Sequence, residues 1–415
     1  MKRILVYDNN FYPEISSLAQ LYTDLCVELA QYFEMYVICA VPSYMGDVEK
    51  RYLGSWIYRE KYRGINIYRV KVRPFNKKNK LSRSISIIGY FFRAIVATVK
   101  MQDVDVILAV SQPPILGGML GALGKTIKKC KLVYNIQDFN PEQIIAVGYS
   151  KNKLLLKLLL EIDKTSCRCA DKIIVVGRDM MNTVYKRFKN ERIAFDTVFI
   201  NNWVDENKLY PLESSHMEVK QFKKQYNLEG KFIFMYSGNI GLIYDLENII
   251  KVAKEFKNNE DITFVFVGDG NVKKTLQDYA KREKLLNVVF IPYQDNDKII
   301  YSLNAADVHL VVNMKGMKGV ACPSKLYGVM AVGKAVLGIL EEGTEAREII
   351  IDSRCGYVIS PGNYNEIKLL IQKMYSEKEL LGEYGKNARQ YLCNKLSREQ
   401  SISKYRRELS ELLEG

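Results

Sequence analysis

The short segment Pro323-Ser324-Lys325 combines residue types that could bind an anion. It lies between an apolar run ending near residue 312 and a second apolar run that is typical of a buried helix. Proline in the first turn and serine as a cap favour a helix start. Because a helix N-terminus carries partial positive charge, a lysine there is unfavourable unless an anion binds beside it. The segment therefore predicts a diphosphate held by Ser324, Lys325 and backbone amides. A solvent-facing lysine is the alternative.

Two glycine-containing loops could bring further backbone N–H groups to the same anion. SGNIG (237–241) follows one apolar run, and GDG (268–270) follows the next. Glycine lets a backbone amide approach a phosphate closely, and each loop precedes a helical pattern whose start adds positive charge. Either loop alone could equally be a tight turn. The residues that we expect at the diphosphate are Gly238, Asn239, Gly241, Gly268, Asp269 and Gly270.

Three polar loops in the first half of the chain also follow apolar runs. They are FYPEISS (11–17), SQPPILGG (111–118) and NIQDFNPE (135–142). A single hydroxyl or carboxylate in such a loop is more often a helix cap or a turn residue. Three loops after three runs support a binding site better than any one of them. The side chains that we expect there are Ser16, Ser17, Ser111, Asp138 and Glu142.

Strands and helices must position these loops. Short runs rich in β-branched residues alternate with helical periodicity, and the pattern restarts near residue 230. This alternation predicts parallel sheets covered on both faces, with ligands beyond the carboxyl ends of the strands. We expect an α/β fold with two doubly wound, Rossmann-like parallel-sheet domains that face each other across a cleft. Residues 1–205 and a C-terminal helix at about 395–415 would form one domain, and residues 206–394 the other.

The net charge of +14 is concentrated in the first half of the chain. Residues 1–205 hold 31 Lys and Arg against 19 Asp and Glu, a difference of +12, which leaves +2 for the rest. A basic stretch at 59–83 leads into an amphipathic, aromatic segment at 81–100, which fits a helix on an anionic membrane surface. A core helix beside a solvated loop is the alternative, and nucleic acid is not expected as a partner. The residues expected at the membrane are Lys77, Lys78, Lys80, Arg83, Tyr90, Phe91 and Phe92.

Several classes of protein are not expected from this sequence. No apolar run is long enough for a transmembrane helix, and the apolar part of MKRILVYDNN is too short for a signal peptide. The eight cysteines lack metal-ligand spacing and fit a reducing compartment. We therefore expect a cytoplasmic protein without a metal site, peripheral on the inner face of the plasma membrane.

Taken together, these segments resemble family 4 glycosyltransferases, which have the GT-B fold. The resemblance is to bacterial enzymes of exopolysaccharide, capsule and O-antigen assembly, the colanic-acid and fucosamine-transferase-like group. It covers nearly the whole chain. The matching segments, in the family's order, are FYPE at 11, VPSYMGD at 41, SQPP at 111, QDFNPE at 137, NNWVD at 201, YSGNIG at 236, VGDG at 267 and PSKLYGVMAVGK at 323.

The resemblance implies a retaining, metal-independent transfer of a sugar from a UDP-sugar, with no resident cofactor. An acetamido sugar would pass to a polyprenyl-diphosphate-linked glycan. The second domain would bind the donor and the first the acceptor. Asp138 and Lys325 would be the catalytic residues. The remaining residues of the donor set would be Tyr293, Ser324 and Gly328.

The chain also departs from the family's pattern. Val320 and Gly328 stand where many relatives have two glutamates, and Gln137-Asp138 stands where many have a histidine. Residues 242–245 replace an arginine and a lysine, so Lys325 would be the main cation on the diphosphate. Sugar recognition could pass to the backbone or to the acidic segment 341–348. Two other functions stay open, a nucleotide-sugar 2-epimerase and a catalytically inactive partner in polysaccharide assembly.

Overall fold

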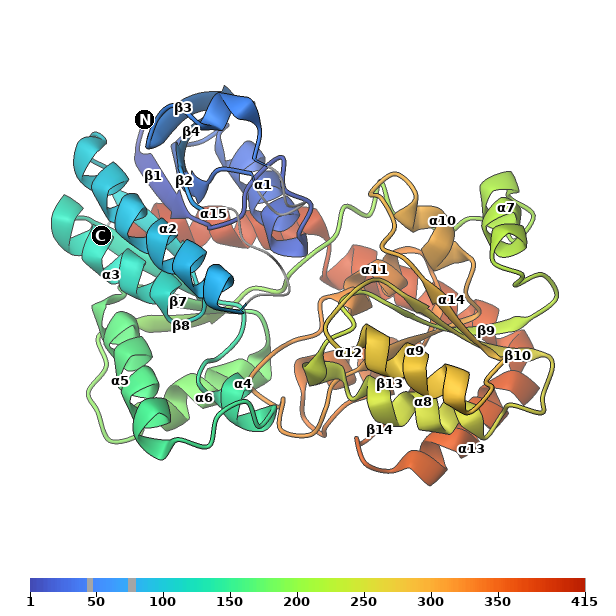
Figure 1. Ribbon diagram of the computed structural model, residues 1–415. Helices are drawn as coiled ribbons and strands as arrows, with labels where there is room; N and C mark the ends of the chain where they lie inside the picture. Colours follow the sequence, from blue (N-terminus) through green and yellow to red (C-terminus); the bar gives the residue numbers. More distant parts are fainter. Residues whose placement is uncertain (43–47, 74–79, 415) are drawn as a thin grey trace. The chain divides into compact units, whose positions relative to one another are not determined.

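The computed structural model describes residues 1–42, 48–73 and 80–414, which form two compact units (Figure 1). The first unit comprises residues 1–176, 180–201 and 401–415, and the second comprises 177–179 and 202–400. The chain therefore passes to the second unit close to residue 205 and returns to the first within the C-terminal helix. We describe each unit by itself.

The first unit is built on an eight-stranded sheet in the order β3-β4-β2-β1-β5-β6-β7-β8. Neighbouring strands are parallel except for β3 and β4, which are antiparallel. The strands are β1 (Arg3–Tyr7), β2 (Glu34–Ala40), β3 (Ile57–Tyr62), β4 (Ile65–Val70), β5 (Val106–Val110), β6 (Lys131–Ile136), β7 (Lys172–Val175) and β8 (Asp196–Phe199). The helices are α1 (Ser17–Leu29), α2 (Lys80–Lys100), α3 (Leu116–Lys128), α4 (Glu142–Ala146), α5 (Lys153–Cys169), α6 (Arg178–Arg187) and α15 (Arg398–Glu414), with a short 3-10 helix η1 (Lys50–Tyr52).

The second unit has a six-stranded parallel sheet in the order β11-β10-β9-β12-β13-β14. Its strands are β9 (Phe232–Ser237), β10 (Ile262–Val267), β11 (Val288–Ile291), β12 (Val308–Val312), β13 (Ala335–Ile339) and β14 (Gly356–Ile359). The helices are α7 (Met217–Gln225), α8 (Leu246–Lys254), α9 (Lys273–Arg282), α10 (Ile299–Asn304), α11 (Lys325–Ala331), α12 (Glu345–Ser353), α13 (Tyr364–Ser376) and α14 (Leu381–Lys395), with 3-10 helices η2 (Leu242–Tyr244) and η3 (Lys378–Leu380).

Burial explains why the central strands are short apolar runs. Every residue of β5 and of β12 is buried, as expected for strands covered on both faces. β3 differs, because its sequence IYREKY is polar and none of its residues is buried. It is an edge strand that pairs with β4 alone. The expectation of two wholly parallel sheets is therefore corrected at this edge.

The C-terminal helix completes the core of the first unit. Tyr405 of α15 is fully buried, and its hydroxyl accepts a hydrogen bond of 2.7 Å from the Asn135 side chain at the end of β6. Lys172 of β7 forms a buried ion pair with Glu408. These contacts join two parts of the first unit that are far apart in sequence.

Helix α2 corrects part of the membrane prediction. Tyr90 and Phe91 are buried, and the Tyr90 hydroxyl donates a hydrogen bond to the Ile38 carbonyl, so both rings pack into the core. Phe92 is exposed, with an exposed fraction of 61%. Lys77 and Lys78 lie outside the described residues, and so do the side chains of Lys80 and Arg83. Among the described helices, none is both long and apolar enough to cross a membrane.

Candidate functional site

The two glycine loops of the second unit lie against each other at the carboxyl ends of β9 and β10. The Gly238 N–H donates to the Val267 carbonyl, and the Ile240 N–H donates to the Asp269 carbonyl. A Cβ on Gly268 would lie 2.0 Å from the Gly238 carbonyl oxygen, and one on Gly270 would lie 2.2 Å from that of Ile240. Gly238 and Gly268 also have φ of 141° and 134°. Only glycine allows this close approach with these angles.

Lys325 lies beside these loops. A Cβ on Gly238 would contact the Lys325 Cε at 3.4 Å. Part of the residue reaches solvent, but its ammonium nitrogen is buried and has no hydrogen-bond partner among the described residues. Burial lowers the pKa of this ammonium well below its usual value. The structure thus brings together Lys325 and both glycine loops, three features that the sequence analysis placed at one site.

Two tyrosines hold the Lys325 ammonium. Its Nζ lies 4.7 Å from the ring centroid of Tyr236 and 3.3 Å from that of Tyr244. A cation over an aromatic face is stabilised by the ring quadrupole, which offsets part of the cost of burying the charge. Ring faces donate no hydrogen bond and carry no formal charge. An anion would therefore still find an unpaired cation here.

The sequence analysis missed both tyrosines. Tyr244 belongs to η2, in the segment where the family resemblance implied an arginine and a lysine. The next residue, Asp245, has φ of 47°, and its carboxylate accepts hydrogen bonds of 2.7 Å from the Tyr364 hydroxyl and the Asn248 amide. These bonds fix the turn that presents the Tyr244 ring to Lys325. The spacing of residues in the sequence does not predict a contact between a tyrosine ring and a lysine side chain.

The helix start at Lys325 carries less of the site than the sequence suggested. Helix α11 has only seven residues, and the exposed hydroxyl of Ser324 makes no capping hydrogen bond. The predicted anion site therefore depends on the buried ammonium and the glycine loops. Tyr293, which follows β11, is exposed. Gly328 is buried in α11, and a Cβ there would have only Leu303 Cδ1, at 3.8 Å, as a neighbour.

The acidic segment 341–348 has a structural role. Glu341 accepts hydrogen bonds from the backbone N–H groups of Gly316 and Lys318, at 2.8 and 3.0 Å. Glu345 is buried and accepts from the backbone and guanidinium N–H of Arg178. Both carboxylates hold the chain in place. We therefore withdraw the hypothesis that these two glutamates recognise the sugar.

In the first unit, two of the predicted polar loops meet. The Ser111 hydroxyl, after β5, accepts a hydrogen bond of 2.9 Å from the backbone N–H of Gln137, after β6. The Gln137 amide donates to Asn135, which in turn donates to Tyr405. Asp138 is next in the chain, and burial raises the pKa of its carboxyl to about 6. The α15 helix thus anchors the loop that carries the predicted catalytic carboxylate.

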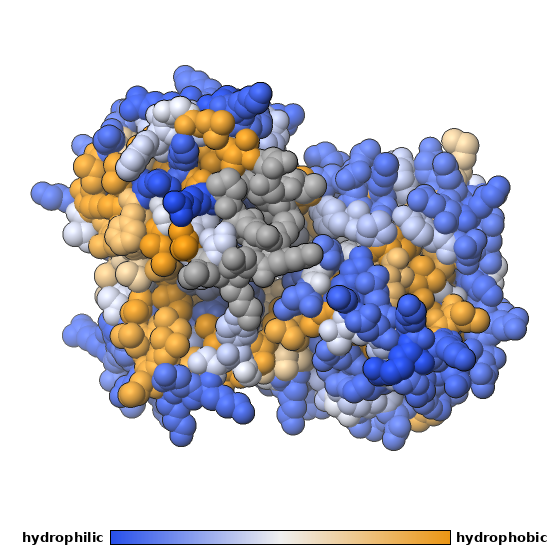
Figure 2. Space-filling model, viewed as in Figure 1, coloured by the Kyte–Doolittle hydropathy of each residue, from blue (hydrophilic) through white to orange (hydrophobic). Residues whose placement is uncertain are grey.

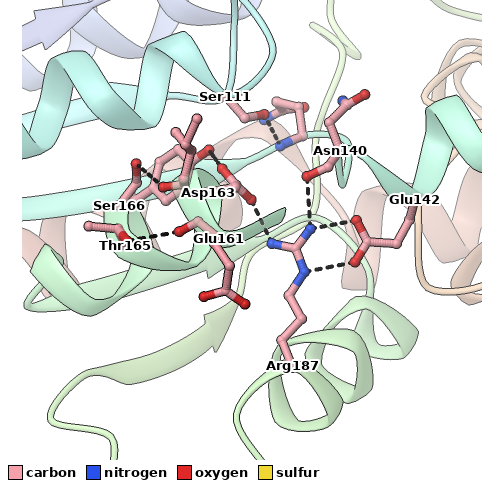
Figure 3. A network of polar contacts seen from close by, with 11 residues as sticks. Ser111, Asn140, Glu142, Glu161, Asp163, Thr165, Ser166 and Arg187 are labelled. Atoms are coloured by element: carbon pink, nitrogen blue, oxygen red, sulfur yellow. Dashed lines mark hydrogen bonds and ion pairs between the residues drawn. The ribbon is translucent and has the colours of Figure 1, made fainter. Parts of the chain in front are cut away.

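Glu142 is not free to bind an acceptor. Figure 3 shows Arg187 between Glu142, Asp163 and the Asn140 carbonyl. The guanidinium reaches both oxygens of Glu142, and Arg187 and Asp163 are almost fully buried. The two carboxylates keep the pKa of Arg187 above its usual value. A paired carboxylate in this network is structural, so we correct the acceptor role predicted for Glu142.

The serines after β1 are divided between two environments. The Ser16 hydroxyl caps α1 by accepting from the Ala19 N–H at 3.3 Å, and Ser17 is exposed at the start of that helix.

Asp8, at the end of β1, was not singled out by the sequence analysis. It is fully buried, and its Oδ2 has no partner among the described residues. Burial raises the pKa of Asp8 to about 8.

Comparison with known proteins shows what this chain is similar to. A protein family described as "Glycosyl transferases group 1" matches residues 218–391, which make up most of the second unit. The putative colanic acid biosynthesis glycosyl transferase WcaI of Escherichia coli K12 is 28% identical over 358 residues, covering 84% of this chain and 85% of that protein. The probable glycosyltransferase WbjE of Pseudomonas aeruginosa is 28% identical over 304 residues, covering 72% and 73%.

Solved structures share the fold over both units. Sucrose-phosphate synthase of Thermosynechococcus elongatus has a TM-score of 0.78 at 13% identity, with 99% of both chains covered. HepE of Anabaena, in complex with UDP and glucose, has a TM-score of 0.72 at 16% identity, with 99% of this chain and 100% of that chain covered. The predicted fold and family resemblance are confirmed. The chain has the GT-B fold, and residues 218–391 are similar to the family described as "Glycosyl transferases group 1".

Proposed function

We propose that this chain transfers a sugar from a UDP-sugar to a polyprenyl-diphosphate-linked glycan, with retention of configuration and without a metal or resident cofactor. The observation that carries the donor part is the buried, unpaired Lys325 ammonium beside the two glycine loops. An anion with several oxygens suits such a site, because it would pair with the cation and accept from backbone N–H groups. The complexes of HepE with UDP support a nucleotide donor.

The reaction needs stabilisation of the charge that develops on the leaving diphosphate. A preorganised cation in a buried site is worth more there than in water. Lys325 would supply this charge as the sugar–oxygen bond breaks. Asp138, whose carboxyl has a raised pKa, would face the acceptor in the first unit. The proposal of an acetamido sugar rests on the resemblance to the fucosamine-transferase-like group.

The lipid-linked acceptor would lie at an anionic membrane surface on the cytoplasmic side. Helix α2 supports this through a row of exposed apolar side chains at helical spacing. They are Ile85, Ile88, Phe92, Val96 and Val99. The stripe differs from the predicted set, because Phe92 is the only aromatic residue of that set on it.

Lys325→Ala tests the donor site. We expect turnover to fall by about 10²-fold or more, the scale of removing one electrostatic donor from a transition state. Turnover would be measured over a screen of nucleotide-sugars, and UDP binding would be measured by calorimetry. The matched control is Lys281→Ala, because Lys281 is exposed on α9 of the same unit.

Three outcomes would contradict the proposal. Equal turnover in Lys325→Ala and in the control would remove Lys325 from catalysis. Conversion of the nucleotide-sugar without any acceptor would favour the 2-epimerase. Failure of the wild type to bind any nucleoside diphosphate would favour an inactive partner in polysaccharide assembly.

A further inference from the structure

The first half of helix α5 projects from the core of the first unit. None of residues 153–162, all of which the structure describes, is buried, although LLLKLLL (154–160) is one of the most apolar stretches of the chain. Leu154 and Leu158 have exposed fractions of 82% and 58%, and Leu155 is also exposed. Exposing leucines in this way is unfavourable in water. We therefore expect a binding partner to cover this segment.

The surroundings of these leucines are apolar and basic. Ile145 of α4 and Tyr149, in the connection to α5, are exposed. Exposed lysines flank the leucines at Lys151, Lys153 and Lys157. No Asp or Glu occurs between residues 143 and 160. We call this set the α5 surface: Ile145, Tyr149, Lys151, Lys153, Leu154, Leu155, Lys157 and Leu158.

The α5 surface continues toward helix α2. Helix α3 packs against both α2 and α5, so it lies between them. It adds the exposed side chains of Leu123 and Ile127. Figure 2 shows hydrophobic residues spread over the side of the first unit where α2, α3 and α5 lie in Figure 1. The apolar area is therefore broad and crosses three helices.

Charge indicates what covers this area. Lys151 and Lys153 flank the helix cap, where the Asn152 side chain accepts from the Leu155 N–H at 3.1 Å. Lysines at a helix N-terminus are unfavourable unless anions are near. Leucines that enter an apolar layer, beside lysines that extend to phosphates, are the pattern of a helix at a lipid interface. A second copy of the chain would bring the same lysines against each other.

We propose that the α5 surface docks on an anionic lipid bilayer, with Leu154, Leu155 and Leu158 entering the interface and the lysines pairing with lipid phosphates. This inference rests on the proposed function, in which the acceptor is carried by a membrane lipid. It adds residues of α5 to the membrane contact that the exposed apolar side chains of α2 would make. Contacts from two helices would fix the orientation of the first unit on the membrane, which α2 alone would not.

Vesicle co-sedimentation tests the proposal with the full chain. The vesicles are phosphatidylcholine with and without phosphatidylglycerol. The combined variant Leu154→Gln, Leu155→Gln, Leu158→Gln should bind anionic vesicles at least about tenfold more weakly than the wild type. Its matched control is Leu286→Gln, Ile351→Gln, Leu369→Gln, which alters three exposed apolar residues of the second unit. Because all six residues are exposed, circular dichroism should show unchanged folding.

A charge variant separates the two parts of the docking. Lys151→Gln, Lys153→Gln, Lys157→Gln should lose about tenfold or more in binding to anionic vesicles, while weak binding to neutral vesicles stays unchanged. Its control is Lys220→Gln, Lys274→Gln, Lys281→Gln, three exposed lysines of the second unit. Equal loss in variant and control would show that net charge, and not this surface, causes binding.

Other results would overturn the inference. If the leucine variant binds vesicles as the wild type does, the α5 surface is not the docking site. If the wild type does not bind vesicles but self-associates, and the leucine variant is monomeric, a second copy of the chain covers the α5 surface. Hydrolysis of the donor in solution should be the same in all these variants. A protein that docks but never turns over any donor would contradict the proposed function, not this inference.

Discussion

Lys325 and Asp138 are both ionisable groups in surroundings of low polarity, and burial acts on them in opposite directions. It lowers the pKa of the lysine and raises that of the aspartate to about 6, because in each case the neutral form is favoured. Tyr236 and Tyr244 partly offset this effect at Lys325 by contacting the cation. A bound diphosphate would restore its full charge. In both residues burial shifts the protonation equilibrium toward the neutral form, and shifts of this kind are common at functional sites.

The raised pKa of Asp138 gives a testable pH dependence. If the ionised carboxylate acts on the acceptor, kcat/KM should rise as the pH increases through about 6 and should fall below it. Asp138→Asn should lower kcat/KM and remove this rise. The measurement is the pH–rate profile of both proteins with a saturating donor. Glu142→Gln is the control, since Glu142 is paired with Arg187. A rise near pH 6 that persists in Asp138→Asn would assign it to another group.

At the scale of elements, the site depends on how closely two loops approach. The loop after β9 and the loop after β10 meet backbone to backbone, without intervening side chains. Parallel pairing of the two strands aligns Val267 with Ser237, so the loops begin at the same level. This places Gly238 next to Gly268 and leaves room for the Lys325 side chain on one side. A small change in this packing would move the predicted phosphate-binding amides.

Gly268→Ala tests this packing. The added Cβ would lie 2.0 Å from the Gly238 oxygen, and φ of 134° is strained for alanine. We expect the free energy of unfolding of the second unit to fall by about 2 kcal/mol or more and UDP binding to weaken. The control is Gly382→Ala, where no atom lies within 4 Å of the new Cβ. Urea denaturation and calorimetry measure both effects. Equal stability of the two variants would show that the loops can separate without cost.

The sequence predicted elements better than contacts. Within the described residues, apolar runs located central strands such as β5 and β12, because a strand buried on both faces must be continuously apolar. The polar edge strand β3 lacks this pattern and was missed. The meeting of Gly238, Gly268 and Lys325 followed from the rule that loops gather at the carboxyl ends of parallel strands. The Tyr244–Lys325 contact, the Glu142–Arg187 pair and the burial of Tyr90 depend on side-chain packing that no local pattern reveals.

At the scale of the whole molecule, each unit contains a buried titratable group that has no oppositely charged partner within the part of the chain that the structure describes. In the first unit this is Asp8. The Asn10 N–H donates a hydrogen bond to its carboxylate, and the neighbouring side chains Tyr22, Cys26, Cys39 and Tyr90 are ordinarily neutral. In the second unit this is His309, whose Nε2 bonds to the Leu303 carbonyl and whose Nδ1 is unpaired among the described residues. Both groups are stable in the fold only when neutral.

The two groups make stability depend on pH with opposite signs. The pKa of Asp8 rises from 3.8 to about 8 on folding, so between these values the unfolded chain has released a proton that the folded chain keeps. Stability from Asp8 is therefore full at low pH and falls as the pH rises toward 8, by about 1.4 kcal/mol per unit. The pKa of His309 falls from 6.5 to about 4, so its contribution is full above 6.5 and is lost as the pH drops toward 4.

Two variants separate these effects in one set of melting curves. Relative to the wild type, Asp8→Asn should gain melting temperature progressively from pH 5 to about pH 8 and then level off, because the amide releases no proton on unfolding. His309→Gln should gain melting temperature relative to the wild type as the pH is lowered from 7 to 4. Between about pH 4 and 6.5 the two contributions should nearly cancel in the wild type, and from pH 6.5 to 8 the loss from Asp8 should remain, so the stability should fall over that range. A difference from the wild type that does not vary with pH, for either variant, would show that the group is ionised in the folded chain.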